Sequence, residues 1–312
     1  MVFAAILVFT GCSTTPAHIN GTSMVGLETQ ITSTAIESAD ISNNILDLSN
    51  MSVDEWASTS PSGQWVATGL VALPKLSTNG EQTSNMSFTR VMIFSTQAIV
   101  KWTVIEKWSD FNLGFPFPKP LAWSSDEDTF YLTNTVTPDG CGAFDYRSGL
   151  ARVDLNNGNV ADLLPTSSSA WVSLSPDKTS LAYIGVGGRG LVLRDLQTGA
   201  EEELNIDPGK DYQAGHILWS PNGGLLALTL VTNPCGDINE LHSSILLVDA
   251  ETLAVRFLLQ EDPRFLITKE WTEAEEIFIV DGTFADATLE DVPYNSRWRI
   301  DINSGVISPE IQ

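Results

Sequence analysis

A few carboxylates, one tyrosine and one histidine are the side chains of this sequence best placed to do chemistry in a shared site. Asp139, Asp145 and Tyr146 lie in one expected loop, Asp237 lies in another, and His216 comes just before an apolar strand motif. Two carboxylates flanking a sugar can act as general acid and as base or nucleophile. A lone histidine can transfer protons, although it more often has a structural role. The same side chains could instead contact a ligand without catalysis, and both interpretations stay open.

Common catalytic and metal-binding patterns are absent from the sequence, which contains neither GxSxG nor HExxH. Its three histidines and three cysteines lack the spacing of a zinc site. The acidic stretch 281–291 lacks the ligand spacing of a calcium loop. Residues 185–190 spell GVGGRG, but a dinucleotide loop must open a helix, and here expected strands flank the segment. We therefore expect a hairpin turn at this segment, no cofactor and no metal, and we favour a non-enzymatic protein, with an enzyme kept as the alternative.

Two cysteines occupy matching places in two similar loop sequences. Cys141 lies in LTNTVTPDGCGAFDY (132–146) and Cys235 in LTLVTNPCGDINEL (228–241). If the third cysteine, Cys12, carries a lipid, an oxidising compartment would favour a disulfide between these two. Two separate buried thiols are the alternative.

The first twelve residues carry a targeting signal. Residues 2–9 are an apolar run too short to cross a bilayer, for which about 20 residues are needed. The run ends in Phe9-Thr10-Gly11-Cys12, which resembles the lipobox of bacterial lipoproteins. This resemblance implies cleavage before Cys12 and a diacylglyceryl group on its sulfur. We expect a lipoprotein signal peptide at 1–12, a Ser/Thr-rich tether at 13–50 and one folded domain at 51–312.

A sequence motif returns five times along the expected domain: an apolar approach, then Ser-Pro-polar-Gly or a remnant of it, then an apolar strand. The copies cover residues 57–68, 122–133, 173–184, 218–229 and 270–281. Their anchor hydroxyl residues are Ser60, Ser124, Ser175, Ser220 and Thr272, so the repeat is 45 to 64 residues long. Such turn residues between apolar runs close a β-hairpin, and such spacing is typical of propeller blades.

A second hairpin follows four of these copies, formed by an alternating strand that ends in Asp, a turn, and another strand. The aspartates are Asp154, Asp195, Asp249 and Asp301. Each unit therefore has four strands. Trp123, Trp219 and Trp271 recur at one repeat position and are expected to pack between blades. A four-stranded sheet cannot bury both faces alone, and radial stacking of such sheets solves this problem.

The segments LWSPNGGLLALT (218–229) and LVLRDLQTG (191–199) resemble the WD-like repeats of TolB propellers and of the propeller domains of prolyl oligopeptidases. The resemblance covers about residues 55–312. It implies an all-β propeller of four-stranded antiparallel blades, with five blades visible. A sixth could come only from residues 20–54, which lack the turn motif. The resemblance implies architecture and not chemistry, because such repeats serve scaffolds, binders and substrate gates alike.

Charge and loop length complete the functional expectation. With 39 acidic and 16 basic residues the net charge is −23. Such a surface repels nucleic acid and anionic lipid headgroups, so we expect no nucleic-acid partner and membrane contact through a lipid anchor only. Long expected loops at 72–87, 134–148, 231–243 and 282–295 would share one face, where they either bind a ligand or only shield it. We expect an envelope lipoprotein, on the periplasmic or cell-surface side, that binds a protein or peptide. A propeller glycan hydrolase or lyase using Asp139, Asp145 and Asp237 is the alternative, and a purely structural role is the third.

Overall fold

The computed structural model describes residues 48–75, 85–96, 100–111, 115–136, 143, 145–185, 190–206, 211–234, 240–272, 276–281 and 296–310. These residues form twenty strands and a one-turn 3-10 helix, η2 (Thr166–Ser168). In the part of the chain described, no helix is long and apolar enough to cross a membrane. The fold class is all-β, as the repeats predict.

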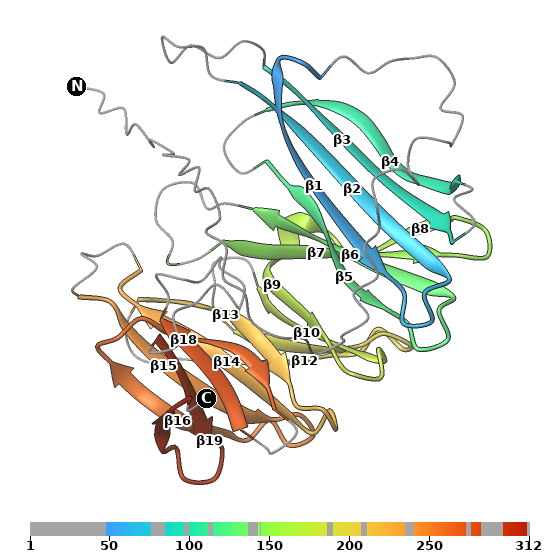
Figure 1. Ribbon diagram of the computed structural model, residues 1–312. Helices are drawn as coiled ribbons and strands as arrows, with labels where there is room; N and C mark the ends of the chain where they lie inside the picture. The colour runs from blue at the N-terminus through green and yellow to red at the C-terminus, as the bar shows by residue number, and fades with distance from the viewer. Residues whose placement is uncertain are drawn as a thin grey trace, which may run out of the picture. The chain divides into compact units, whose positions relative to one another are not determined.

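Consecutive strands pair antiparallel into five four-stranded sheets, which we call blades 1 to 5 (Figure 1). Blade 1 contains β1 (Met51–Thr59), β2 (Trp65–Pro74), β3 (Met86–Ser95) and β4 (Val100–Asp110). Blade 2 contains β5 (Phe117–Trp123), β6 (Thr129–Val136), β7 (Tyr146–Asp154) and β8 (Val160–Leu164). Blade 3 contains β9 (Ser169–Leu174), β10 (Ser180–Gly185), β11 (Leu191–Asp195) and β12 (Glu201–Leu204).

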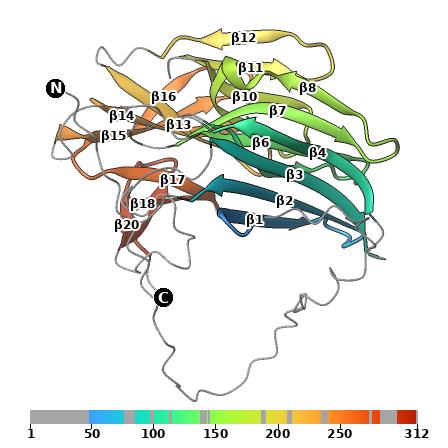
Figure 2. The ribbon, with the colours of Figure 1, turned by 90° about the horizontal axis from the view of Figure 1, so that it is seen from above.

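Blade 4 contains β13 (Tyr212–Trp219), β14 (Leu225–Thr232), β15 (His242–Asp249) and β16 (Val255–Asp262). Blade 5 contains β17 (Leu266–Trp271), β18 (Glu276–Asp281), β19 (Arg297–Asp301) and β20 (Ile307–Pro309). Figure 2 shows the strands of a blade lying side by side in chain order. The predicted four-stranded antiparallel blades are therefore confirmed.

The anchor hydroxyl closes the first hairpin of each blade. Ser220 Oγ accepts a hydrogen bond of 2.9 Å from the backbone N–H of Leu225, five residues ahead. The same bond forms at Ser60, Ser124 and Ser175. In blade 5, Thr272 accepts from the N–H of Glu276 at 3.1 Å, so this turn is one residue shorter. These hydroxyls are conformational elements of a turn.

The repeated aspartates close the second hairpin. Asp195 Oδ1 accepts from the backbone N–H groups of Gln197 and Thr198 at 2.9 and 2.6 Å, and Gly199 follows at a φ of +73°. Asp249 and Asp301 accept two backbone N–H groups in the same way. Asp154 accepts from the backbone N–H of Asn156 and from the side-chain amide of Asn157. These hydrogen bonds, with that from the Thr198 backbone the largest, lower the pKa of Asp195. The repeated carboxylates hold turns.

The segment that spells GVGGRG joins two strands of one hairpin. β10 and β11 pair antiparallel, with Ile184 opposite Leu191. The pairing of these two strands confirms the predicted hairpin, and residues 186–189 themselves lie outside the described residues. A dinucleotide-binding loop leads into a helix. Here the next element after β10 is the strand β11.

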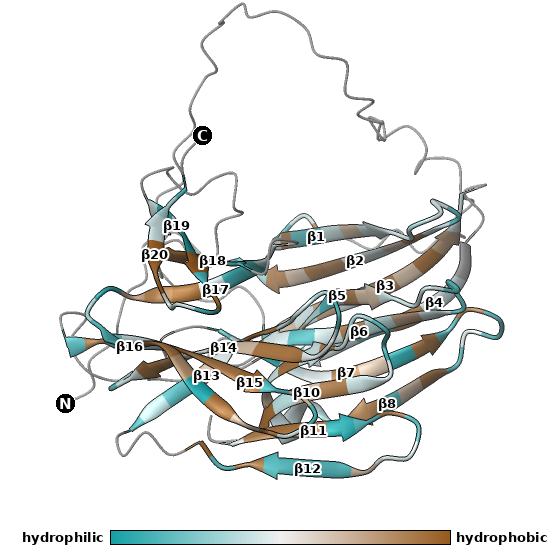
Figure 3. Cartoon of the chain, turned by 90° about the horizontal axis from the view of Figure 1, so that it is seen from below, coloured by the Kyte–Doolittle hydropathy of each residue, from teal (hydrophilic) through white to brown (hydrophobic). Residues whose placement is uncertain are grey.

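Apolar cores lie between neighbouring blades. Buried clusters join blades 1 and 2, blades 2 and 3, blades 3 and 4, and blades 4 and 5. Hydrophobic residues are carried by the strands, whereas β12 is mostly hydrophilic (Figure 3). Trp123 Nε1 donates to Ser58 Oγ at 3.0 Å, Trp219 Nε1 donates to a blade 3 carbonyl at 3.2 Å, and Trp271 packs between blades 4 and 5. Packing between blades, predicted for these three tryptophans, is confirmed.

Candidate functional site

Four basic and aromatic side chains from four blades come together, and we call them the basic–aromatic cluster: Arg147, Trp171, His216 and Lys269. They belong to β7, β9, β13 and β17, respectively. The last three strands are the first strands of blades 3, 4 and 5, and β13 contacts both β9 and β17. Residues up to 122 positions apart in the sequence thus meet where the first strands of the blades lie together.

The indole of Trp171 is the centre of the cluster. Its ring centroid lies 4.3 Å from that of His216, with 33° between the ring planes. The guanidinium carbon of Arg147 lies over the same indole, 4.9 Å from the ring centroid. The Trp171 side chain is only 6% exposed, so its neighbours cover it almost completely. Cation–π attraction of this kind contributes about 0.5–2 kcal/mol, more when the cation is desolvated.

Two β-bulges place His216 and Lys269. The pairing of β13 with β14 shifts register between Gly215 and Leu218, and His216 within the bulge has a φ of +50°. The pairing of β17 with β18 shifts between Thr268 and Glu270, which flank Lys269. Bulges redirect side chains, and histidine is among the residues that tolerate a positive φ.

A pair of buried threonines connects the two bulged strands. Thr268 Oγ1 donates to the His216 carbonyl at 2.6 Å, and Thr229 Oγ1 accepts from the Thr268 N–H at 3.0 Å. Both threonines are fully buried. These bonds satisfy backbone groups that the bulges leave out of the ladder, and they fix β13 against β17.

The cluster holds a neutral imidazole beside cations. Burial lowers the pKa of His216 well below its usual value, and the charges of Lys269 and Arg147 lower it further. Burial also lowers the pKa of Arg147, which remains charged because a guanidinium does not lose its proton in proteins. Solvent nevertheless reaches Arg147, which is exposed. Desolvation of the guanidinium thus coexists with solvent exposure of the residue as a whole.

Arg147, like Arg152 and Arg256, forms no ion pair with a carboxylate among the described residues. Five described arginines form ion pairs with carboxylates: Arg90, Arg194, Arg264, Arg297 and Arg299. The contact that the described residues provide for the Arg147 guanidinium is the ring face of Trp171. A guanidinium without a carboxylate partner is suited to bind an anion.

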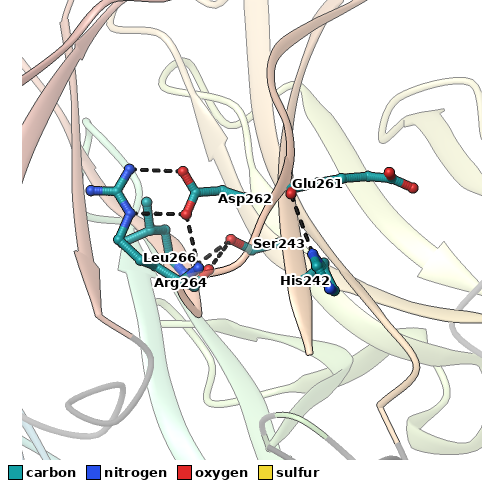
Figure 4. Close-up of polar contacts among 6 residues, drawn as sticks. All are labelled: His242, Ser243, Glu261, Asp262, Arg264 and Leu266. Atoms are coloured by element: carbon teal, nitrogen blue, oxygen red, sulfur yellow. Dashed lines mark hydrogen bonds and ion pairs between the residues drawn. The ribbon is translucent and has the colours of Figure 1, made fainter. Parts of the chain in front are cut away.

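A second polar network lies at the junction of blades 4 and 5 (Figure 4). Arg264 pairs with Asp262 through two hydrogen bonds of 2.7 and 2.9 Å. Ser243 Oγ donates to the Arg264 carbonyl at 2.7 Å and accepts from the Leu266 N–H at 3.0 Å. This arginine is thus occupied in joining β15, β16 and β17.

A recess of about 480 Å³ lies near this network, lined by Asp211, Thr232, Asn233, Glu240 and His242. His242 Nδ1 lies 3.3 Å from the Glu261 carbonyl. Among the described residues no group of three or more His, Cys, Asp or Glu side chains could hold a metal ion. The described residues that line this recess include no arginine or lysine, in contrast to the basic–aromatic cluster.

The structure describes three of the residues singled out from the sequence. His216 belongs to the basic–aromatic cluster. Tyr146, expected in a loop, is the first residue of β7 and packs against the core between blades 3 and 4. Asp145 immediately precedes that strand. The others lie outside the described residues: Cys12, Asp139, Cys141, Cys235 and Asp237.

Sequence reasoning missed Arg147, Trp171 and Lys269. The repeat alignment contains a partial signal, because Trp171 and His216 both stand four residues before their anchor serines, and Lys269 stands three before Thr272. Arg147 has no such signal, since it enters from a third strand.

Comparisons with known proteins find similarity in structure. No protein-family model matches the sequence, and no curated protein matches it. An oligogalacturonate lyase from Vibrio parahaemolyticus is 11% identical, with a TM-score of 0.46 over 83% of this chain and 59% of the lyase. TolB from Acinetobacter baumannii is 12% identical, with a TM-score of 0.37 over 84% of this chain and 63% of TolB.

The β-propeller domain of the Trilobed protease from Pyrococcus furiosus is 10% identical, with a TM-score of 0.47 over 83% of this chain and 70% of that domain. This chain is itself a β-propeller. The identification follows from its five consecutive four-stranded antiparallel sheets with apolar cores between neighbours. The propeller spans less than two thirds of the lyase and of TolB. The structures similar to it include TolB, one of the two kinds of propeller that its repeats resemble.

Proposed function

We propose that this protein is a non-enzymatic binding propeller of the bacterial cell envelope, and that it holds a protein or peptide ligand at the basic–aromatic cluster. The observation that carries the proposal is the position of Arg147, an exposed residue whose guanidinium lies over Trp171 without a described carboxylate partner. Charged groups positioned on a rigid scaffold, with their own rotamers fixed by packing, are suited to binding.

The chemistry of the cluster favours binding over turnover. A general base is oriented by a third group, and a nucleophile lies within its reach. No described carboxylate is among the groups that shift the pKa of His216, and the groups that do are cations. Arginine has no lone pair with which to accept a proton. The described residues of the cluster can therefore attract and orient an anion.

The envelope location rests on the lipobox-like segment that ends in Cys12 and on the Ser/Thr-rich stretch 13–50. Two acyl chains suffice for stable anchoring, since each buried CH₂ contributes about 0.8 kcal/mol. Cells expressing the full-length chain with labelled palmitate should give a labelled, membrane-bound product. Cys12→Ser should abolish labelling while the propeller remains folded. A secreted, unlabelled wild type would refute the anchor.

Capture from crosslinked envelopes tests the binding function. Wild-type protein should retain a defined protein partner, and Arg147→Gln should lose it. Arg299→Gln is the matched control, because it removes an equal charge from a half-buried pair with Glu276 in blade 5. Capture that is equal in the two variants would contradict binding at the cluster. Turnover of an envelope polysaccharide by purified wild type, abolished by Asp145→Asn, would replace the proposal with the glycan hydrolase or lyase.

A further inference from the structure

We infer that a cavity between blades 3 and 4, which we call the interblade cavity, is a second binding site that takes a lysine or arginine side chain from a basic peptide segment of a partner protein. Its volume is about 410 Å³, within the usual size range of ligand sites. The described residues that line it include none of the four members of the basic–aromatic cluster. The inference is therefore independent of the proposed function, and either can fail without the other.

The walls of the interblade cavity are turns of two neighbouring blades. Blade 3 contributes the turn that begins at Ser175, the turn at Asp195 and part of β12. Blade 4 contributes the turn that begins at Ser220 and the turn between β15 and β16. The half-buried indole of Trp219 also lines the cavity, and its hydrogen bond of 3.2 Å to a blade 3 carbonyl fixes the ring.

A glycine keeps this junction between blades open. Gly223 stands third after the anchor serine of blade 4 at a φ of +76°, and a Cβ there would come no closer than 3.7 Å to its nearest neighbour, Pro176 Cδ. In blade 2 the equivalent residue is Glu127, whose carboxylate crosses to blade 1 and accepts hydrogen bonds from Ser60 and Ser62. A side chain thus bridges blades 1 and 2 at this position, whereas between blades 3 and 4 its place is left to a ligand.

Negative charge predominates around the cavity. One guanidinium lines it, that of Arg194, together with four carboxylates: Asp177, Asp195, Glu202 and Glu251. Arg194 is engaged on the other side of its sheet, because its Nη1 donates to the Leu163 carbonyl of blade 2 at 3.0 Å. A cleft lined mainly by one sign of charge concentrates the field and attracts ligands of the opposite sign.

Two of these carboxylates are available to a ligand. Glu202 pairs with Leu193, and residues directly opposite each other share a face, so Glu202 lies on the side of blade 3 that faces blade 4. Glu202 and Glu251 are both exposed, and within the described part of the chain neither carboxylate has a hydrogen-bond or ion-pair partner.

The other two carboxylates stay charged in mild acid. Asp177 and Asp195 accept hydrogen bonds within their own turns, and these bonds, as the largest cause, lower the pKa of both carboxyl groups. The negative charge of the cavity therefore persists over the pH range in which a lysine or arginine is a cation.

The lining favours a long cationic side chain over a metal ion. In the described part of the chain no group of three or more His, Cys, Asp or Glu side chains could hold a metal. A lysine or arginine can lay its aliphatic stem along Trp219 and Pro221 while its charged end reaches a carboxylate. The indole also attracts the cation directly. The net charge of −23 speeds the approach of a basic peptide.

Fluorescence anisotropy on the full-length chain tests this inference with two labelled decapeptides. One carries two lysines among Gly and Ser residues, and its partner carries acetyl-lysine at both positions, which removes the charge. We expect wild type to bind the lysine peptide about tenfold more tightly, through one cation–π contact and ion pairs with partly exposed carboxylates.

A pair of glycine substitutions locates the site. Gly223→Lys puts a competing cation into the cavity and should remove the preference. Gly63→Lys is the matched control, because Gly63 is the equivalent residue of blade 1, with a φ of +75° and no neighbour within 4 Å of a Cβ. Lys178 occupies the equivalent position of blade 3 at a φ of +63°, so this turn accommodates a lysine.

A pair of charge substitutions on one strand gives a second control. Glu202→Gln should weaken binding of the lysine peptide at least about twofold, as expected for a partly exposed ion pair. Glu203→Gln removes the same charge from the next residue, which lies opposite Val192 on the side facing blade 2, and should leave binding unchanged.

Carbodiimide crosslinking gives a readout that needs no variant. The reagent joins a lysine amine to a carboxylate in contact with it as an amide, and mass spectrometry locates the bond. We expect the lysine peptide to be joined to Glu202 or Glu251 of the wild-type chain. The inference therefore stays testable even if a substitution prevents folding.

The outcomes distinguish a site from general attraction to an acidic chain. Equal binding of the two peptides would overturn the inference. Equal loss of preference in Gly223→Lys and Gly63→Lys, or crosslinks spread over many surface carboxylates, would also overturn it. Binding of spermidine but of neither peptide would overturn the peptide as ligand class. Capture of a partner through Arg147 should be the same in Gly223→Lys as in wild type, so failure here leaves the proposed function standing.

Discussion

Replacing His216 by asparagine should change how stability depends on pH. In the folded chain, burial first, then Lys269 and Arg147, keep the pKa of His216 well below its usual value. In the unfolded chain a histidine titrates near its ordinary pKa of about 6.5. Below that pH the unfolded state binds a proton that the folded state does not. Folding stability therefore falls as pH falls, and above about pH 7.5 this group makes no pH-dependent contribution.

The magnitude follows from this linkage. Each pH unit below the unfolded pKa lowers the free energy of unfolding by about 1.4 kcal/mol until the folded pKa is reached. Between about pH 7.5 and pH 5.0 wild type should lose at most about 2 kcal/mol through His216 alone, the full amount if the folded imidazole stays neutral throughout. Asparagine cannot titrate, and it tolerates the φ of +50° at this position. It does lose the ring contact with Trp171, which contributes about 0.5–1.5 kcal/mol at any pH.

Urea unfolding followed by tryptophan fluorescence measures both quantities. At about pH 7.5 His216→Asn should be the less stable protein by about 1 kcal/mol. By about pH 5.0 the difference should have moved toward the variant, by at most about 2 kcal/mol, with equal urea dependence in both proteins. All other titrating groups are common to the two chains and cancel. A difference that stays constant with pH would show that the imidazole is not shielded, and the argument would be wrong.

Two further substitutions test contacts at blade 1. A Cβ at Gly69 would overlap the indole of Trp56, so Gly69→Ala should lower the free energy of unfolding by about 2 kcal/mol in urea titrations. Gly224→Ala is the control: a Cβ there makes only ordinary contacts, so the free energy of unfolding should change little. Glu127 accepts hydrogen bonds from Ser62 of the neighbouring blade, which are the first cause of its lowered pKa. This stabilisation is present above about pH 4.5 and is lost as pH falls through the lowered pKa. Glu127→Gln should therefore be less stable than wild type near neutrality, and the two proteins should be equally stable in acid. A persistent difference in acid would contradict it.

The blades could be predicted from sequence because their determinants are local. Ser220 bonds five residues ahead and Asp195 two and three residues ahead, so each hairpin is specified by a short stretch of chain. Turn residues at fixed offsets therefore indicate strand order and blade number. The strand ends were less predictable: Tyr146 extends β7 into an expected loop because its side chain packs between blades 3 and 4.

The basic–aromatic cluster could not be predicted in the same way. His216 was noticed only as an isolated histidine, because its neighbours come from three other blades. Their meeting depends on two bulges and on the position of β7 beside β9, neither of which has a marker in the repeats. Tertiary contacts between residues such as Arg147 and Trp171 are set by how blades stack, and a repeat pattern specifies each blade separately.

The hydroxyl-anchored and aspartate-anchored turns have a consequence for the order of folding. Because each blade is built from hairpins that close within a few residues, its strands can pair as soon as they leave the ribosome or a translocation channel. Contacts such as the Trp219 bond to blade 3 span 46 residues and must wait for the following blade. The chain can therefore assemble progressively from one end, each completed blade serving as the template on which the next one docks.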